Sequence, residues 1–181
     1  MVTPTVEPEP RMRELLAPLM RDADVRLYLR IEVKGGGAVD PADLVYPIIF
    51  SPDFDRGPYQ DAEPKRPSTV AELSSELFLV DVPPMRLVPF LQMLLTTDFA
   101  YLESRASLSQ QEAESIARKV VDLVGADARW WSNVEYPKWA WEYGDFSGDF
   151  GANPLTGHTY DCAMVGVGDS VAVAFLAYSD D

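Results

Sequence analysis

Two long apolar segments near the C-terminus constrain the fold of this 181-residue chain more than any other feature. The segments YDCAMVGV and SVAVAFLAY are rich in residues that favour strands, and the turn sequence GDS joins them. A glycine followed by an aspartate between two such segments is a strong signal for a β-hairpin. We therefore expect an antiparallel sheet that contains this hairpin.

Other segments predict further strands of the same sheet. Residues 25–33 alternate between apolar and polar side chains, which is the pattern of a strand with one buried face. Strands are also predicted at residues 43–50, 76–82, 129–136 and 138–145, the last two flanking a turn at Pro137.

Three segments predict helices. Residues 12–20 and 87–95 carry apolar side chains at helical spacing, although Pro18 and Pro89 interrupt them. Ser109 and Glu112 form a capping box at the start of the longest predicted helix, which ends at Gly125. The class is therefore α+β: an antiparallel sheet of about five or six strands, packed against one long and one or two shorter helices.

The sequence predicts one domain. Residues 1–10 are rich in proline and glutamate and are expected to be a disordered lead-in, while residues 11–181 form a single α+β domain. The long segment 51–68 holds four prolines and mixed charge, so we expect a loop that could border a binding site.

The charge of the chain is strongly negative. It carries 15 Lys and Arg against 29 Asp and Glu, a net charge of -14, and residues 130–181 hold eight acids with Lys138 as the only base. Such a field repels nucleic acids and anionic lipid surfaces and favours a basic partner protein. We expect neither nucleic-acid nor membrane binding.

The single cysteine, Cys162, excludes an intramolecular disulfide, a cysteine-rich zinc site and an iron–sulfur cluster. Neither a secretory signal nor a membrane-spanning segment is evident, so a cytoplasmic protein without metal or cofactor is expected. Asp145, Ser147 and Asp149 begin like a calcium loop, but the glycine and glutamate that such a loop requires are missing.

The most unusual segment is WWSNVEYPKWAWEYGDFSGDF, residues 130–150, which contains all four tryptophans. In a strand, Trp139 and Trp141 would share a face, whereas the adjacent Trp130 and Trp131 would point to opposite faces, leaving one at least partly exposed. The cluster could be part of the core, a sugar-stacking platform or a partner-binding surface. The predicted partner-binding residues are Trp130, Trp131, Glu135, Trp139, Glu142, Asp145 and Asp149.

No catalytic set is evident. His158 and Cys162 are four residues apart, and a strand would hold them about 13 Å from one another, beyond hydrogen-bond reach. The chain is therefore interpreted as an acidic protein-binding module rather than an enzyme. In its combination of exposed acids and aromatic anchors it resembles bacterial immunity proteins, which implies inhibition of a basic toxin. The alternatives are a small glycosidase-like hydrolase that uses the same carboxylates, and a structural component of a phage or secretion assembly.

Overall fold

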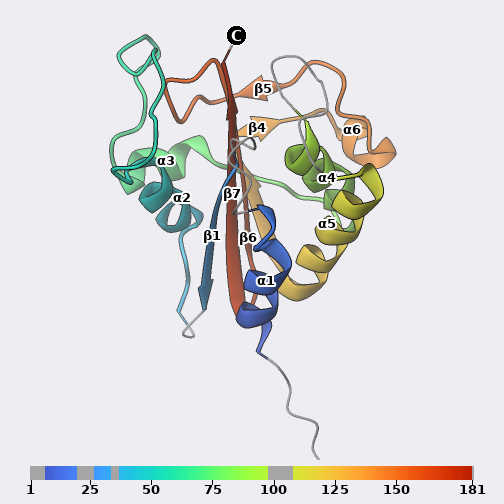
Figure 1. The fold of residues 1–181 in the computed structure, drawn as a ribbon. Coiled ribbons are helices and arrows are strands. Elements are labelled where there is room, and N and C mark those ends of the chain that lie inside the picture. Colours follow the sequence, from blue (N-terminus) through green and yellow to red (C-terminus); the bar gives the residue numbers. More distant parts are fainter. Residues whose placement is uncertain (1–6, 20–26, 34–36, 98–107, 181) are drawn as a thin grey trace, which may run out of the picture.

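The computed structural model describes residues 7–19, 27–33, 37–97 and 108–180. A five-stranded antiparallel sheet lies between two layers of helices, which confirms the predicted α+β class (Figure 1). Its strands follow the order β1 (Leu27–Val33), β7 (Val171–Ser179), β6 (Tyr160–Val167), β3 (Arg129–Ser132) and β2 (Phe78–Leu79). Two short strands, β4 (Val134–Glu135) and β5 (Gly151–Ala152), pair beside this sheet.

The predicted C-terminal hairpin forms the centre of the sheet. In β6, Cys162 and Met164 point into one core and Ala163 and Val165 into the other, and β7 alternates in the same way. Both faces of these two strands are covered, which is why their sequences are almost continuously apolar.

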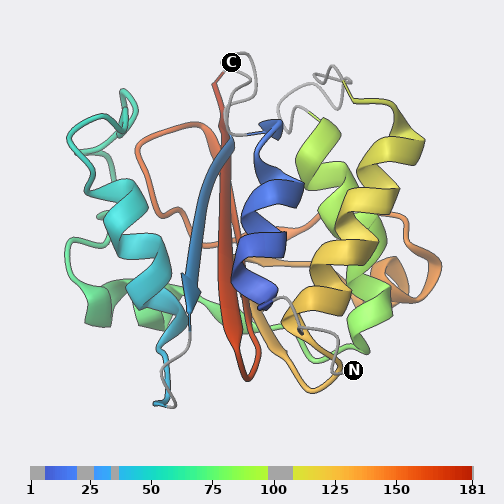
Figure 2. The same cartoon turned by 60° about the horizontal axis from the view of Figure 1, so that its bottom comes forward.

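Helices cover the two faces unequally (Figure 2). One core lies beneath α1 (Pro8–Leu16), α4 (Val88–Thr96) and α5 (Gln110–Val124), and a short 3₁₀ helix, η2 (Pro84–Leu87), leads into α4. The other core lies beneath α2 (Pro41–Ile49) and α3 (Val70–Glu76). The sheet is therefore the middle layer of three.

The helix predicted from its capping box is confirmed. The Ser109 hydroxyl and the Glu112 carboxylate each bond the other residue's backbone N–H, and α5 ends before Gly125, whose φ is 111°. The helix predicted at 87–95 is also present, because Pro89 lies in the first turn of α4, where its missing N–H costs little.

The first helix begins earlier than expected. Pro8 opens α1, so the ordered domain starts before Arg11, and Pro18 lies beyond the end of the helix rather than within it. A proline at the first helical position has a backbone angle suited to the helix. Residues 1–6 of the expected lead-in lie outside the described residues.

The strand predicted at residues 43–50 is wrong, since this segment forms α2. The Asp40 carboxylate accepts a hydrogen bond from the Ala42 N–H at 2.9 Å, and Pro41 occupies the first turn. Leu44, Val45 and Ile48 then face the sheet together. A short run of apolar residues suits either structure, and here the cap and the tertiary packing favour the helix.

The strand predicted at residues 138–145 is also wrong. Residues Lys138–Tyr143 form helix α6, which Pro137 precedes and Gly144 ends with a left-handed φ of 66°. The tertiary structure brings α6 and the following loop against the end of η2 and α4, and Gly144 approaches the ring of Pro89. Trp139 and Trp141 consequently do not share a face.

The segment 51–68 is a loop, as expected, and it packs against residues 155–158. The Tyr59 N–H donates to the Gly157 carbonyl at 2.8 Å, and the Gly157 N–H donates to the Arg56 carbonyl at 2.6 Å. A Cβ on Gly157 would lie 2.3 Å from the Gln60 nitrogen, so this approach of two backbones requires glycine.

Candidate functional site

Trp130 belongs to the core and is not an accessible anchor. Only 2% of its surface is exposed, and it points toward the α5 side of the sheet. Its partner in the register is Gly166, where even a Cβ would lie 2.6 Å from the indole ring. The prediction that Trp130 contacts a partner is therefore wrong, because Gly166 leaves the space that buries it.

Trp131 points to the opposite face, as the alternation of a strand requires. It is half-buried beside the second core, and the Arg129 guanidinium lies 5.2 Å from its ring centroid. The expectation that one of the two adjacent tryptophans is partly exposed is confirmed. Trp131 lies in the main sheet, whereas the other predicted residues lie on or around α6.

An aromatic cluster anchors α6 to the rest of the fold. Trp141 packs 5.2 Å from Phe90 and 4.9 Å from Phe146, and Tyr136 lies 5.8 Å from Phe90, all as centroid distances. Aromatic pairs in such edge-on or tilted arrangements stabilise the fold beyond the contribution of burial alone. Burial also raises the pKa of the Tyr136 hydroxyl, which stays neutral. The aromatic cluster therefore fixes the position of α6 against the rest of the fold.

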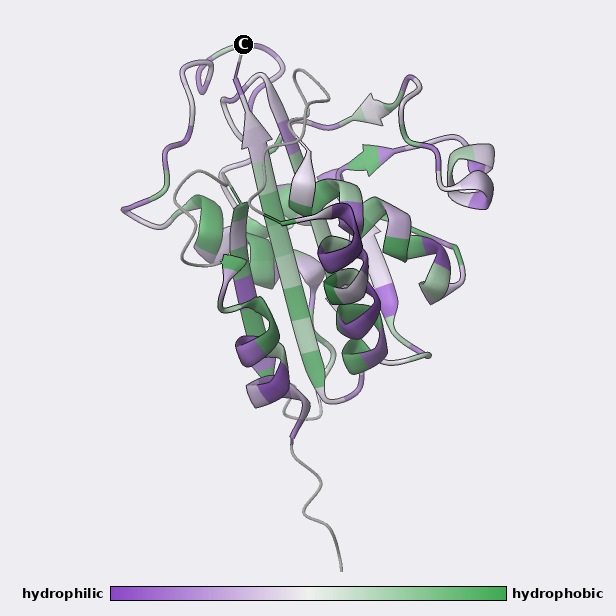
Figure 3. Cartoon of the chain, turned by 45° about the vertical axis from the view of Figure 1, so that its right-hand side comes forward, coloured by the Kyte–Doolittle hydropathy of each residue, from purple (hydrophilic) through white to green (hydrophobic). Residues whose placement is uncertain are grey.

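The outward face of α6 carries two exposed aromatic side chains. Trp139 is 44% exposed and Tyr143 is 80% exposed, and their spacing of four residues places them on one side of the helix. The rim of the Trp139 indole lies close to Gly148, where a Cβ would approach it to 3.1 Å. Figure 3 shows α6 projecting from the body of the protein beside the β4–β5 pair.

Four predicted acids surround this helix and are exposed: Glu135, Glu142, Asp145 and Asp149. Glu142 lies 3.7 Å from Lys138, and within the described residues it is the only one of the four in an ion pair. Pairing of β4 with β5 places Glu135 opposite Gly151, two residues from Asp149. We call Glu135, Trp139, Glu142, Tyr143, Asp145 and Asp149 the α6 surface.

Asp145 also organises the loop that follows α6. Its carboxylate accepts hydrogen bonds from the Ser147 hydroxyl at 2.6 Å and the Ser147 N–H at 3.1 Å. These bonds lower the pKa of Asp145, so it remains negatively charged. The four acids predicted to bind a partner are thus all exposed, as that role requires, whereas Tyr143 was not among the predicted residues.

The loop that follows α6 also borders a cavity of about 620 Å³. The residues that line it include Phe146, Asp149 and Phe150 of this loop, together with Arg66, Tyr160 and Asp161. The long loop 51–68 contributes Arg66, so it borders a cavity as expected.

Asp161 is the centre of a buried polar network that sequence reasoning missed. Its carboxylate accepts hydrogen bonds from the Thr156 N–H and hydroxyl, both at 2.7 Å, from Asn133 Nδ2 at 2.8 Å and from the Leu155 N–H. Burial raises the pKa of Asp161, and the surrounding donors oppose that shift. In the sequence, the only indication of this network is that Asp161 lies at the start of an otherwise apolar predicted strand.

His158 and Cys162 do not form a catalytic pair. The His158 ring stacks on Tyr178 at 3.6 Å, with Nδ1 2.9 Å from the Asp180 carboxylate and Nε2 2.7 Å from the Asp55 carbonyl. Cys162 faces the opposite core. Both side chains are buried, and His158 holds the 51–68 loop against the end of the sheet.

Cys162 is expected to be unreactive in the folded protein. Burial raises the pKa of its thiol, and the thiolate is the reactive form. Iodoacetamide near pH 8 should leave it unmodified for hours without denaturant and modify it within minutes in urea, as intact-mass measurements would record. Rapid alkylation of the native protein would contradict its buried position.

Within the described ranges, no cluster of His, Cys, Asp and Glu could hold a metal ion. No helix in that part of the chain has the length and apolar character to cross a membrane. Comparison with known protein families, with curated proteins and with solved structures gives no match.

Proposed function

We propose that this protein is an acidic protein-binding module that inhibits a basic partner protein through the α6 surface. The observation that carries the proposal is the pair of exposed aromatic side chains, Trp139 and Tyr143, on a firmly anchored helix surrounded by acids. Exposed Trp and Tyr that are held in place beforehand are the usual anchors of tight interfaces.

The charges around the two anchors support a basic partner. Glu135, Glu142, Asp145 and Asp149 are all exposed, and Lys138 is the only base in residues 130–181. Such a field accelerates association with a positively charged surface and repels nucleic acid. The resemblance in character to bacterial immunity proteins makes a basic toxin the favoured partner. A lone, buried thiol suits the reducing cytoplasm, where we place the interaction.

The cavity is the observation that favours the alternative of a small hydrolase. Both Asp149 and Asp161 line it, and a glycosidase needs two carboxyl groups that face its substrate. However, four hydrogen bonds from within the protein occupy the Asp161 carboxylate. A binder is therefore the better explanation of the exposed residues, and Asp161 has a structural role.

A capture experiment tests the proposal. The full chain is used as bait in a lysate of the source cell, and the captured protein is purified for titration calorimetry and stopped-flow kinetics. We expect a basic protein. Trp139→Ala should weaken its binding by at least about 2 kcal/mol, or roughly 30-fold. Glu142→Lys with Asp145→Lys should chiefly slow association and reduce its dependence on salt.

A control with the same change in charge separates the α6 surface from the net charge of the chain. Asp127 and Asp169 are exposed in the turns at the far end of β3 and β6, and Asp127→Lys with Asp169→Lys should leave affinity nearly unchanged. Equal losses in the two double variants, or no captured partner, would argue against the proposal. Self-association of the purified chain on a sizing column would instead favour a structural component of an assembly.

A further inference from the structure

The cavity beside the α6 surface contains a buried arginine that lacks an acidic partner. Arg66 is only 9% exposed, yet within the described residues no carboxylate lies within ion-pair distance of its guanidinium. Burying a charge is costly unless an opposite charge or a full set of hydrogen bonds compensates it. An arginine held in this way is well placed to receive an anion.

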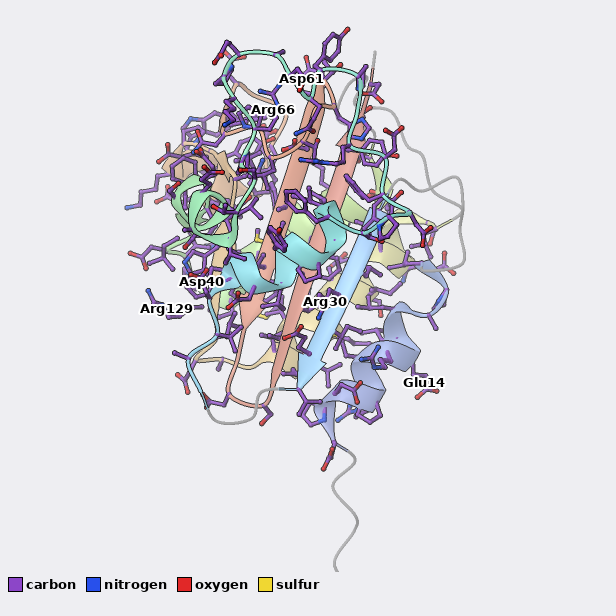
Figure 4. All side chains as sticks on the ribbon, turned by 90° about the vertical axis from the view of Figure 1, so that its left-hand side faces the viewer. Glu14, Arg30, Asp40, Asp61, Arg66 and Arg129 are labelled. Carbon is purple, nitrogen blue, oxygen red and sulfur yellow. The ribbon has the colours of Figure 1, made fainter. Side chains whose placement is uncertain are left out.

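Two of the three guanidinium nitrogens of Arg66 already have partners. Nε donates to the Thr156 carbonyl at 2.5 Å, and Nη1 donates to the Pro64 carbonyl. These bonds fix the orientation of the side chain. Nη2 donates no hydrogen bond within the described part of the chain and is not among its buried unpaired atoms, so it can donate to a ligand in the cavity that Arg66 lines. Figure 4 labels Arg66 in the 51–68 loop, at the same end of the molecule as Asp61.

The other charged groups around the cavity do not neutralise Arg66. The Asp161 carboxylate is occupied by its four donors, and the His158 ring by Asp180 and the Asp55 carbonyl. Asp149 also lines the cavity, but it is exposed and makes no ion pair with Arg66 within the described residues. The cavity therefore has one cationic group that can still donate a hydrogen bond, Arg66. The Asp149 carboxylate disfavours a ligand that carries two negative charges.

The other residues that line the cavity indicate the chemical character of the rest of the ligand. Phe146 and Phe150 supply apolar surface, and Tyr160 supplies a partly exposed ring with a hydroxyl. A volume of about 620 Å³ lies within the range of small-molecule sites. A doubly charged phosphate suits a cavity with a single arginine and the Asp149 carboxylate less well than a singly charged carboxylate does.

We propose that this cavity binds a small molecule that carries one carboxylate on an aromatic or apolar body. The carboxylate accepts a hydrogen bond from Arg66 Nη2, and the body packs against Phe150 and Tyr160. This site shares only Asp149 with the α6 surface, and the proposal does not depend on the identity of a protein partner.

Benzoate is a suitable probe, with inorganic phosphate for comparison. The ¹⁵N-labelled full chain is titrated with each at constant ionic strength, and the amides of Gly148, Phe150 and Tyr160 are followed together with the Arg66 Nε–H. We expect saturable shifts with benzoate, weaker shifts with phosphate, and intermolecular NOEs from benzoate to the rings of Phe150 and Tyr160.

Three variants distinguish binding from a structural role of Arg66. Arg66→Gln should weaken benzoate binding at least about tenfold, which corresponds to the loss of one charge-assisted hydrogen bond. Asp149→Asn should strengthen benzoate binding, because it removes a negative charge that lines the cavity. A purely structural role of Arg66 would not predict this gain. Arg118→Gln, which removes an exposed arginine of α5, is the matched control and should have no effect.

The proposal is overturned if benzoate gives no saturable shifts or if its NOEs fall outside the cavity. It is equally overturned if Arg66→Gln binds benzoate as tightly as the wild type. Should Arg66→Gln fail to fold, the NOEs of the wild type and the response of Asp149→Asn still decide, since neither requires that variant.

Discussion

Replacing Asp161 by alanine should destabilise the fold by about 3 kcal/mol, because it leaves buried hydrogen-bond donors without an acceptor. The backbone N–H groups of Leu155 and Thr156 both donate to this carboxylate. Each buried donor that loses its partner costs about 1–3 kcal/mol. The total is a large part of the 5–15 kcal/mol that stabilises a typical domain, so urea denaturation followed by tryptophan fluorescence should detect it easily.

Asp161→Asn and Asp169→Ala are the controls for this variant. Asparagine keeps the shape and one accepting oxygen, so it should cost less than alanine, although its NH₂ group faces other donors. Asp169 lies exposed in the β6–β7 turn, where alanine should change the stability by less than about 0.5 kcal/mol. If Asp161→Ala and Asp169→Ala were equally stable, the buried network would not hold the loops as described.

The raised pKa of Asp161 adds a dependence on pH with a definite sign. Because the carboxyl is harder to ionise in the folded than in the unfolded protein, its contribution to stability is complete below the unfolded pKa. That contribution is lost as the pH rises through the folded pKa. The stability of the wild type relative to Asp161→Asn should therefore fall as the pH rises above the unfolded pKa of about 3.9, and a constant difference would contradict the shift.

Gly166→Val should also destabilise the protein by about 3 kcal/mol, the upper part of the range for overpacked cores. The first atom of the new side chain would lie 2.6 Å from the ring of Trp130, which is almost completely buried. Gly37→Val is the matched control, because among the described residues nothing lies within 4 Å of a Cβ there. Urea denaturation of both variants measures the difference.

A double-mutant cycle tests the cause of that loss. Trp130→Phe removes part of the indole, and the Trp130 Nε1 makes no hydrogen bond to any described residue, so this change costs packing alone. Combined with Gly166→Ala, it should cost at least about 1 kcal/mol less than the sum of the two single changes. Additive effects would show that the contact between Gly166 and the indole does not set the stability.

Helix α6 shows how a local pattern can support two structures. WAWEY alternates as a strand does, but the same residues also place Trp139 with Tyr143 and Lys138 with Glu142 at helical spacing. Pro137 before the segment and Gly144 after it are the boundary residues of a helix. These two boundary residues favour the helix over the strand. In the helix, Trp139 and Trp141 lie on different faces.

The cavity could not be predicted in the same way. Arg66 and Tyr160 are far apart in the sequence, and nothing local to either indicates that the 51–68 loop packs on the residues before β6. The glycines that permit this contact, Gly57 and Gly157, look like ordinary turn residues in the sequence. Close contacts between backbone segments that are distant in the sequence produce no periodic pattern of residues from which they could be predicted.

The central hairpin, the capped helix α5, the α+β class and the concentration of acids after residue 130 could all be predicted from the amino-acid sequence. These features follow from hydrogen bonding, side-chain alternation and charge, which act over a few residues. The burial of Trp130 and Trp141 and the exposure of Trp139 depend instead on the packing of the whole fold. Periodicity assigns a side chain to one face of a helix or strand, but a side chain is buried only where distant segments pack against that face.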